Sequence, residues 1–305
     1  MRKPEHEWQS PSARGTTFVI GSLFNTIRLA TGPREIASVL RFVFKYLMWC
    51  LRGSSSVERD ETLRLQGVTH VIGLGTGELL MPQEIYWQRV YERHPDFVAR
   101  PGWIVLDVGA NTGVYTVQQA RRGAYVYAFE PNPDCYRRLL KAVRANHVED
   151  RVTAVDHALG ATAGSAELLL PAGLTILGTL RPEWTSGAGG VGLRVELETV
   201  DQVVSTLGIN RIDLLKVDVE GLELDVLQGA RETLALVDRL VLEYHSQDLG
   251  RRVVELLAGH GLTTVLDETT YRGDENKYRG CGRGLLFARR RAASEWGRST
   301  PVAVA

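Results

Sequence analysis

A short stretch of alternating charged residues is the part of this sequence best suited to chemistry. Lys216, Asp218 and Glu220 occupy alternate positions in the otherwise apolar segment LLKVDVEG, so a strand would place all three on one face. Burying charged groups costs several kcal/mol each unless they pair or contact a ligand. A structural explanation is also open: a lysine–carboxylate pair closing a strand, with Glu220 and Glu223 at a helix start, where the helix dipole favours acids.

A second charged segment, LVLEYH, ends in Glu243 and His245. The unperturbed pKa of histidine lies nearest to neutrality, which favours His245 as a general base, with Glu220 as the alternative. A histidine here could equally cap a strand end. Carboxylates and a histidine could also hold Mg²⁺. The four candidate ligands for that ion are Asp218, Glu220, Glu243 and His245.

The segment VLDVGANTGVYT (105–116) indicates a strand that passes through a small-residue turn into a helix. Its glycines have GxxxG spacing, which differs from the GxGxxG of dinucleotide-binding turns. Asp107 would repel a pyrophosphate but would suit a ligand with an ammonium group and no phosphate, a description that fits S-adenosylmethionine. The residues predicted to contact the cofactor in this turn are Asp107, Gly109, Ala110, Asn111, Thr112 and Gly113.

Acidic residues also follow two later predicted strands, where they could contact other parts of the same cofactor. Glu130 lies about 20 residues after the turn, where a carboxylate would accept hydrogen bonds from both ribose hydroxyls. Asp156 follows the next strand, at a suitable place for the adenine edge, and Asp218 would lie near the methionine end. Each signal alone fits an ordinary strand-to-helix turn, whereas their order favours a cofactor site. The cofactor contacts predicted beyond the turn are Glu130, Pro131, Asn132, Asp156, Ala158, Lys216 and Asp218.

From residue 102 onward, apolar runs alternate with helix-like segments, which is typical of a parallel sheet with helices on both faces. The expected strands are 103–108, 125–129, 152–155, 212–217 and 240–244, and the expected helices are 114–122, 134–146, 200–207, 222–236 and 251–260. Two final strands, 262–266 and 284–288, have no helix between them and indicate an antiparallel hairpin at one edge. Residues 171–192, rich in Gly, Thr and Pro, predict a long loop near the site.

The motifs VLDVGANTG, FEPNP, HALG, TVDQ, DLLKVDVEGLELDVLQGA and LVLEYH together resemble the FkbM family of S-adenosylmethionine-dependent methyltransferases. They follow the family's order over roughly half of the chain, and KVDVEG is fairly specific to it. The resemblance implies an α/β, Rossmann-like class I methyltransferase fold, with a seven-stranded, mostly parallel sheet whose last strand is antiparallel. It also implies O-methylation of a hydroxyl, often on a sugar or polyketide product.

The chain divides into four expected parts. Residues 1–60 form an N-terminal helical appendage, 61–100 a lead-in or cap with a helix at 82–93, 101–290 the methyltransferase domain, and 291–305 a flexible tail, with a linker at 53–56. The appendage and the 171–192 loop fall outside the motifs, so the family resemblance does not identify the substrate of this chain. For the basic, aromatic helix at 39–49, packing on the domain or on a second subunit is favoured over binding to a membrane surface.

The composition of the chain limits the classes of binding partner that we expect. The 305 residues include 36 Lys+Arg and 36 Asp+Glu, so no net field would attract nucleic acid. Neither a secretory signal nor a run of roughly 20 apolar residues is found. The three cysteines form no CxxC or Cys/His cluster, which favours a reducing cytoplasm. We expect a small-molecule hydroxyl acceptor as the partner, no nucleic acid, and a homo-oligomer as an open alternative to a monomer.

The expected activity is an S-adenosylmethionine-dependent O-methyltransfer to a sugar, glycoside or polyketide alcohol. Such a transfer is an in-line displacement that needs alignment at about 3 Å, and the alcohol needs a base. The expected catalytic residues are Asp218, Glu220 and His245. Two alternatives stay open: an NAD-dependent Rossmann oxidoreductase, which the turn spacing and Asp107 count against, and a non-catalytic cofactor-binding subunit, which the intact DVEG segment counts against.

Overall fold

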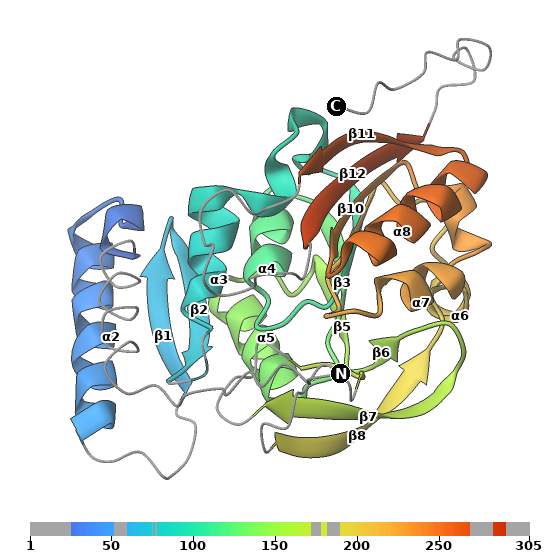
Figure 1. The fold of residues 1–305 in the computed structure, drawn as a ribbon. Helices are drawn as coiled ribbons and strands as arrows, with labels where there is room; N and C mark the ends of the chain where they lie inside the picture. Colours follow the sequence, from blue (N-terminus) through green and yellow to red (C-terminus); the bar gives the residue numbers. More distant parts are fainter. Residues whose placement is uncertain are drawn as a thin grey trace, which may run out of the picture.

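A computed structural model gives the fold and describes residues 26–51, 60–74, 76, 78–171, 178–181, 190–268 and 283–290. A seven-stranded sheet occupies its centre (Figure 1), with the strand order β11-β12-β10-β9-β3-β4-β5. The strands are β3 (Ile104–Val108), β4 (Tyr125–Phe129), β5 (Val152–Val155), β9 (Leu214–Val217), β10 (Arg239–Tyr244), β11 (Leu262–Glu268) and β12 (Gly284–Arg290).

Strand directions match the expected fold class. β12 pairs antiparallel with both β10 and β11, whereas β10–β9, β9–β3, β3–β4 and β4–β5 are parallel. The prediction of a seven-stranded, mostly parallel sheet with an antiparallel last strand is therefore confirmed, and so is the closing hairpin. Because β3, β4, β9 and β10 run the same way, the residues that follow them meet at one edge of the sheet.

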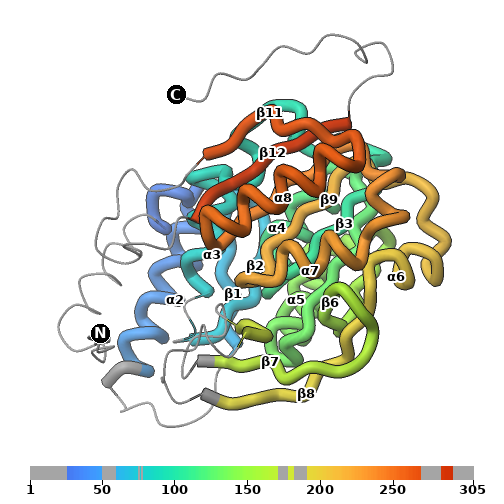
Figure 2. Tube along the Cα trace, turned by 45° about the vertical axis from the view of Figure 1, so that its right-hand side comes forward, coloured from blue at the N-terminus to red at the C-terminus, as the bar shows by residue number. Residues whose placement is uncertain are grey.

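Helices cover both faces of this sheet (Figure 2). The core on one face includes residues of α4 (Val114–Arg121) and α5 (Pro133–Ala145). The core on the other includes residues of α6 (Val200–Thr206), α7 (Glu223–Gln228) and α8 (Gln247–Gly259). Local chemistry sets the helix starts: Asn132 caps α5, with a proline at the first helical position, and Thr199 forms a capping box with Gln202.

Two expected helices are shorter than predicted. The segment 222–236 contains α7, which ends at Gln228, and then a separate 3₁₀ helix, Thr233–Leu236. The segment 82–93 begins at the last residue of α3 (Leu80–Pro82) and continues as a π-helix (Gln83–Gln88) and a 3₁₀ helix (Val90–Glu92). Arg89 stops the π-helix because it adopts the left-handed conformation, with φ of +50°, which side-chain propensity does not reveal.

The predicted loop at 171–192 is flanked by strands that the sequence interpretation missed. A second, three-stranded sheet has the order β6-β8-β7, with β6 (Ala158–Leu159), β7 (Gly164–Pro171) and β8 (Gly190–Glu198). Thr179 forms an isolated bridge with Leu169 of β7. We call β7, β8 and residues 178–181 the β7–β8 arm. The sequence VGLRVELE in β8 alternates apolar and polar residues, a strand signal that was available.

The N-terminal elements share a core of their own. α2 (Pro33–Leu51) packs on the antiparallel hairpin of β1 (Asp60–Leu65) and β2 (Val68–Gly73). Their buried core consists of Leu29, Val39, Phe42, Leu63, Leu65, Ile72 and Leu74. The helix of the expected appendage and the hairpin of the expected lead-in thus form one packed unit. The expected linker at 53–56 and tail at 291–305 lie outside the described residues.

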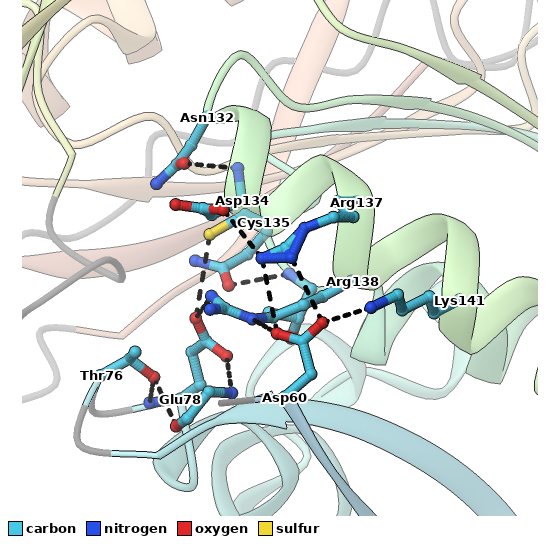
Figure 3. Close-up of polar contacts among 12 residues, drawn as sticks. Asp60, Thr76, Glu78, Asn132, Asp134, Cys135, Arg137, Arg138 and Lys141 are labelled. Carbon is cyan, nitrogen blue, oxygen red and sulfur yellow. Dashed lines mark hydrogen bonds and ion pairs between the residues drawn. The ribbon is translucent and has the colours of Figure 1, made fainter. Parts of the chain in front are cut away.

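A buried ion-pair cluster fastens this unit to α5 (Figure 3). Arg138 is fully buried; its Nε lies 2.9 Å from Asp60 Oδ1 and its Nη1 lies 2.6 Å from Glu78 Oε1. Arg137 and Lys141, from the same helix, also pair with Asp60. Breaking a buried pair by removing one partner costs about 3–5 kcal/mol, so this cluster holds the hairpin firmly against the helix that follows β4.

Among the described residues, none of the helices is both long and apolar enough to cross a bilayer.

Candidate active site

The turn after β3 fits tightly against the turn after β9. Gly109 has φ of +81°, and a Cβ at this position would lie 1.8 Å from the carbonyl oxygen of Asp218. The N–H groups of Gly109 and Ala110 both donate to the carbonyl oxygen of Phe129 at 3.0 Å. Glycine is therefore required at 109 by the neighbouring backbone, which fixes the turn against β4 and β9 together.

Glu130 joins the turns that follow β3 and β4. Its carboxylate accepts hydrogen bonds from the backbone N–H of Asn111 at 2.7 Å and of Asn132 at 2.8 Å. Burial raises the pKa of Glu130 to about 7, against the lowering effect of these two N–H groups. A carboxylate with two fixed donors and remaining lone pairs is thus held at the mouth of the turn.

Two buried polar atoms in the same turns have no hydrogen-bond partner in the part of the chain that the structure describes. They are Thr112 Oγ1 and Asn132 Nδ2. A buried polar atom without a partner costs about 1–3 kcal/mol, so a ligand that supplies partners would relieve this cost. Farther along the sheet edge, the Asp156 side chain is largely exposed. Ala158 lies buried in β6.

Asp107 lies beneath the turn rather than at its surface. It is fully buried, 3.0 Å from Lys216 Nζ, and its Oδ2 accepts a hydrogen bond from Thr116 Oγ1 at 2.6 Å. The β3–β9 register pairs Asp107 with Lys216 directly. Although burial alone would lower it, Asp107 and Asp218 keep the pKa of Lys216 above its usual value. The charge of Asp107 is therefore balanced within the protein.

Tyr91, from the lead-in segment, reaches the site and was not predicted. Its hydroxyl donates to Asp218 Oδ2 at 2.7 Å, and Lys216 Nζ lies 5.3 Å from the centre of its ring. Burial raises the pKa of Asp218, but the charges of Lys216 and His245 and the Tyr91 hydroxyl outweigh it and lower the pKa overall. Tyr91 is 127 positions away from Asp218 in the chain, and no local pattern connects the two.

His245 lies between two carboxylates. Its Nδ1 is 2.7 Å from Glu223 Oε1, and its Nε2 is 3.2 Å from Glu220 Oε2. Burial would lower the pKa of His245, but these two carboxylates raise it well above the usual value. The two carboxylates therefore favour the protonated form of the ring, in which both nitrogens donate.

Glu220 does not lie on a strand face as expected. β9 ends at Val217, and Glu220 follows in a turn with a left-handed φ of +49°. Of the three alternating charges, only Lys216 lies in the strand. Glu220 lies in the turn, and the turn places it next to His245. Arg283 also reaches it, with Nη2 2.9 Å from Glu220 Oε2.

Two carboxyl groups of this cluster remain partly open to solvent. The side chains of Glu220 and Glu243 are 21% and 23% exposed, whereas Glu223 is fully buried. Burial and the nearby charge of Asp218 raise the pKa of Glu243 to about 8. The raised pKa favours the protonated form of Glu243, which can donate a hydrogen bond to an incoming molecule.

The expected metal ligands are partly brought together. Ligand atoms of Asp218, Glu220 and His245 lie within 4.8 Å of one another in the described part of the chain. Glu243 is not part of that group, and its Oε1 is 3.9 Å from His245 Nε2. In this arrangement the positive charge facing Glu220 comes from His245 and Arg283.

The β7–β8 arm contacts the turn that carries Glu220. Thr179 Oγ1 donates to the Glu220 carbonyl oxygen at 2.9 Å, and Arg181 Nε donates to the Gly221 carbonyl oxygen at 2.7 Å. Arg181 Nη2 also lies 2.7 Å from Asp225 Oδ2. Because a left-handed glutamate is strained, these contacts stabilise the turn in the conformation that directs Glu220 to His245.

Arg181→Ala is expected to lower kcat by about tenfold and leave cofactor affinity within about threefold, because only the Glu220 turn loses its support. Steady-state kinetics and calorimetry on the purified protein measure both quantities. Arg194→Ala, an exposed arginine on β8 of the same arm, is the matched control and should behave as wild type. Equal kcat for the two variants would contradict a positioning role for Arg181.

Comparison with known proteins agrees with these features. Residues 107–267 match the family described as the methyltransferase FkbM domain. The 31-O-demethyl-FK506 methyltransferase FkbM of Streptomyces tacrolimicus is 33% identical over 242 residues, which cover 68% of this chain and 91% of that protein. The hexuronic acid methyltransferase AglP of Haloferax volcanii is 29% identical over 163 residues, covering 53% of this chain and 64% of that protein.

Among solved structures, an rRNA methylase from Streptococcus thermophilus resembles the chain at 11% identity and a TM-score of 0.40, covering 64% of this chain and 90% of that one. A likeness at that level says nothing about substrates, so the absence of a nucleic-acid partner stays a prediction. The sequence resemblance is confirmed by the family match and by the FkbM relative. The chain belongs to the FkbM methyltransferase family.

Proposed function

We propose that this chain is an S-adenosylmethionine-dependent O-methyltransferase that acts on a hydroxyl of a sugar, a glycoside or a polyketide-type product. The observation that carries the proposal is that two sets of residues, one around Glu130 and one around His245, lie at the same edge of the sheet. The turns around Glu130 offer polar atoms for a nucleoside. The residues around His245 offer carboxyl groups for an acceptor hydroxyl.

The turn residues fit the expected cofactor. The ribose hydroxyls would donate to Glu130, whose two oxygens already face this edge, and the orphaned atoms of Thr112 and Asn132 would gain partners. Asp156 would meet the adenine, and Asp218 the amino group of the methionine end. When bound, the cofactor supplies an electrophilic methyl group on a sulfonium.

Glu130→Gln is expected to weaken S-adenosylhomocysteine binding by about ten- to a hundredfold, because the amide keeps the shape but accepts fewer hydrogen bonds. Hydroxyl donors favour the ionised carboxylate, so wild-type binding should tighten as pH rises through about 7 and then level off. Calorimetry between pH 6 and 8 checks both points. The exposed Glu149→Gln serves as the control. A pH-independent wild-type affinity would contradict the ribose role of Glu130.

In the proposed reaction, Glu220 would take the proton of the acceptor hydroxyl. The hydroxyl oxygen would receive the methyl group that the sulfonium would supply, and the sulfur would leave as a neutral thioether. The Glu220 side chain is 21% exposed, and His245 and Arg283 hold its carboxylate oxygen in place. Glu243, whose raised pKa favours the protonated form, can donate a hydrogen bond to a second oxygen of the acceptor. His245 contacts Glu220 and thereby orients the base, while buried Glu223 holds the other ring nitrogen.

The grouping of Asp218, Glu220 and His245 supports a second candidate, in which Mg²⁺ is bound there and polarises the hydroxyl. If Glu220 accepts the proton without a metal ion, EDTA should leave turnover unchanged, because His245 and Arg283 already supply the positive charge next to Glu220. Assays with EDTA alone and with EDTA plus excess Mg²⁺ distinguish the two. A loss of turnover that Mg²⁺ restores would assign the cluster to a metal.

The names of two relatives support an O-methyl product: a 31-O-demethyl-FK506 methyltransferase and a 2-O-methyltransferase. The proposal is tested by incubating the purified chain with methyl-labelled S-adenosylmethionine and a panel of glycosides and polyketide alcohols. We expect label in an O-methyl product from the chain alone. Label transfer only after a second protein is added would favour a non-catalytic cofactor-binding subunit.

A further inference from the structure

The helix α2 is apolar on two opposite faces. Its inner face, with Val39 and Phe42, is buried against the β1–β2 hairpin. The outer face carries residues spaced four, four and three apart, which share one side of a helix. Their exposed fractions are large for apolar side chains: Ile36 41%, Leu40 54%, Phe44 63% and Leu47 51%. Such a continuous exposed apolar stripe marks an interaction surface.

Cations run along one side of this stripe. Arg34, Arg41 and Lys45 are all exposed. At 100° per residue they follow one another within a narrow sector next to the apolar residues. Glu35 is the only acidic residue of α2, and it is buried, where it accepts hydrogen bonds from the hairpin N–H groups of Gln66 and Gly67. Lys45 pairs with Glu61, so two arginines remain for a partner.

We propose that the outer face of α2 docks on an anionic lipid surface, with the helix lying in the plane of the membrane. An interfacial helix needs apolar residues on one side and cations at their flank, and here Arg34 and Arg41 supply the free cations. The apolar side chains would enter the headgroup–acyl boundary, and the two arginines would reach lipid phosphates. A second copy of the chain would fit this face less well, because it would bring the same cations and no exposed acid of α2 to pair with them.

The place of α2 in the fold suits this docking. Figures 1 and 2 show α2 as an outer layer of the molecule, with the hairpin between it and α5. The residues around His245 follow β9 and β10 of the central sheet, and α2 does not contribute to them. Membrane contact through α2 would therefore leave the proposed methyl-transfer site intact, and the two proposals can fail independently.

The test is co-sedimentation of the full chain with vesicles of phosphatidylcholine, alone or mixed with phosphatidylglycerol. We expect binding to the anionic vesicles and at least about tenfold weaker binding to neutral ones. The double substitution Leu40→Glu plus Phe44→Glu should weaken anionic-vesicle binding by at least about tenfold, because it removes the inserted side chains. Arg34→Glu plus Arg41→Glu should abolish the preference for anionic lipid, and added salt should weaken wild-type binding.

Leu236→Glu, an exposed leucine on the 3₁₀ helix after α7, is the matched control and should bind vesicles as wild type does. Circular dichroism confirms that each variant is folded. The proposal is overturned if wild type does not bind anionic vesicles, or if the Leu40/Phe44 variant binds them equally well. It is also overturned if light scattering finds a dimer that this variant dissolves, which would assign the face to a second copy.

Discussion

Glu220→Gln should lower kcat by about a hundred- to ten-thousandfold, the range over which a general base contributes to catalysis. The substitution keeps the size of the side chain but removes the charge that accepts the hydroxyl proton. Cofactor affinity should stay within about threefold, because Glu220 is not among the proposed cofactor contacts. Single-turnover assays with labelled cofactor, together with calorimetry, measure both quantities.

The control for this substitution is Glu268→Gln. Glu268 is also partly exposed and paired with an arginine, Arg93, at 3.4 Å, but it lies on β11. It should retain wild-type turnover. If Glu220→Gln keeps kcat within about threefold of this control, Glu220 is not the proton acceptor. Glu243 would then be the next partly exposed carboxyl group to substitute.

Gly109→Ala should raise the Kd for S-adenosylhomocysteine by at least about a hundredfold, because the new Cβ must displace the backbone at Asp218. The contact would otherwise be 1.8 Å to its carbonyl oxygen. The displacement moves both the cofactor turn and the Asp218–Glu220 turn. Calorimetry gives the affinity, and thermal unfolding gives the accompanying loss of stability.

Gly102→Ala separates the clash from backbone strain. Gly102 has the same φ of +81°, but a Cβ there meets nothing within 4 Å. Both variants carry the strain of a left-handed alanine, on the order of 1–3 kcal/mol, and only Gly109→Ala carries the clash. Equal cofactor affinity in the two variants would contradict the close approach of the two turns as the reason for glycine at 109.

The main sheet could be predicted because its signals are local. The expected strands 125–129 and 152–155 coincide with β4 and β5, and the expected helix 134–146 differs from α5 by one residue at each end. Each strand–helix unit has its own apolar run and its own turn residues, so it can be predicted without knowing its contacts with distant parts of the chain. The β7–β8 strands were missed because the Gly-rich composition between them outweighed the alternation in β8.

The candidate site was only partly predictable, because its electrostatics depend on contacts between distant segments. Asp107 was expected to face a ligand, yet the β3–β9 register places Lys216 beside it. His245 was favoured as the base because of the unperturbed pKa of histidine, yet Glu220 and Glu223 lie against its two ring nitrogens. Tyr91 arrives from the lead-in with no motif of its own. A pKa reflects the sum of such neighbours, which spacing along the chain does not contain.

The central claim, a cofactor site for S-adenosylmethionine at this sheet edge, is tested most directly by calorimetric titration of the purified chain. Separate titrations use S-adenosylhomocysteine and NADH. The account predicts saturable binding of S-adenosylhomocysteine and no heat of binding for NADH. Binding of NADH without binding of S-adenosylhomocysteine would contradict it and would point to the oxidoreductase alternative.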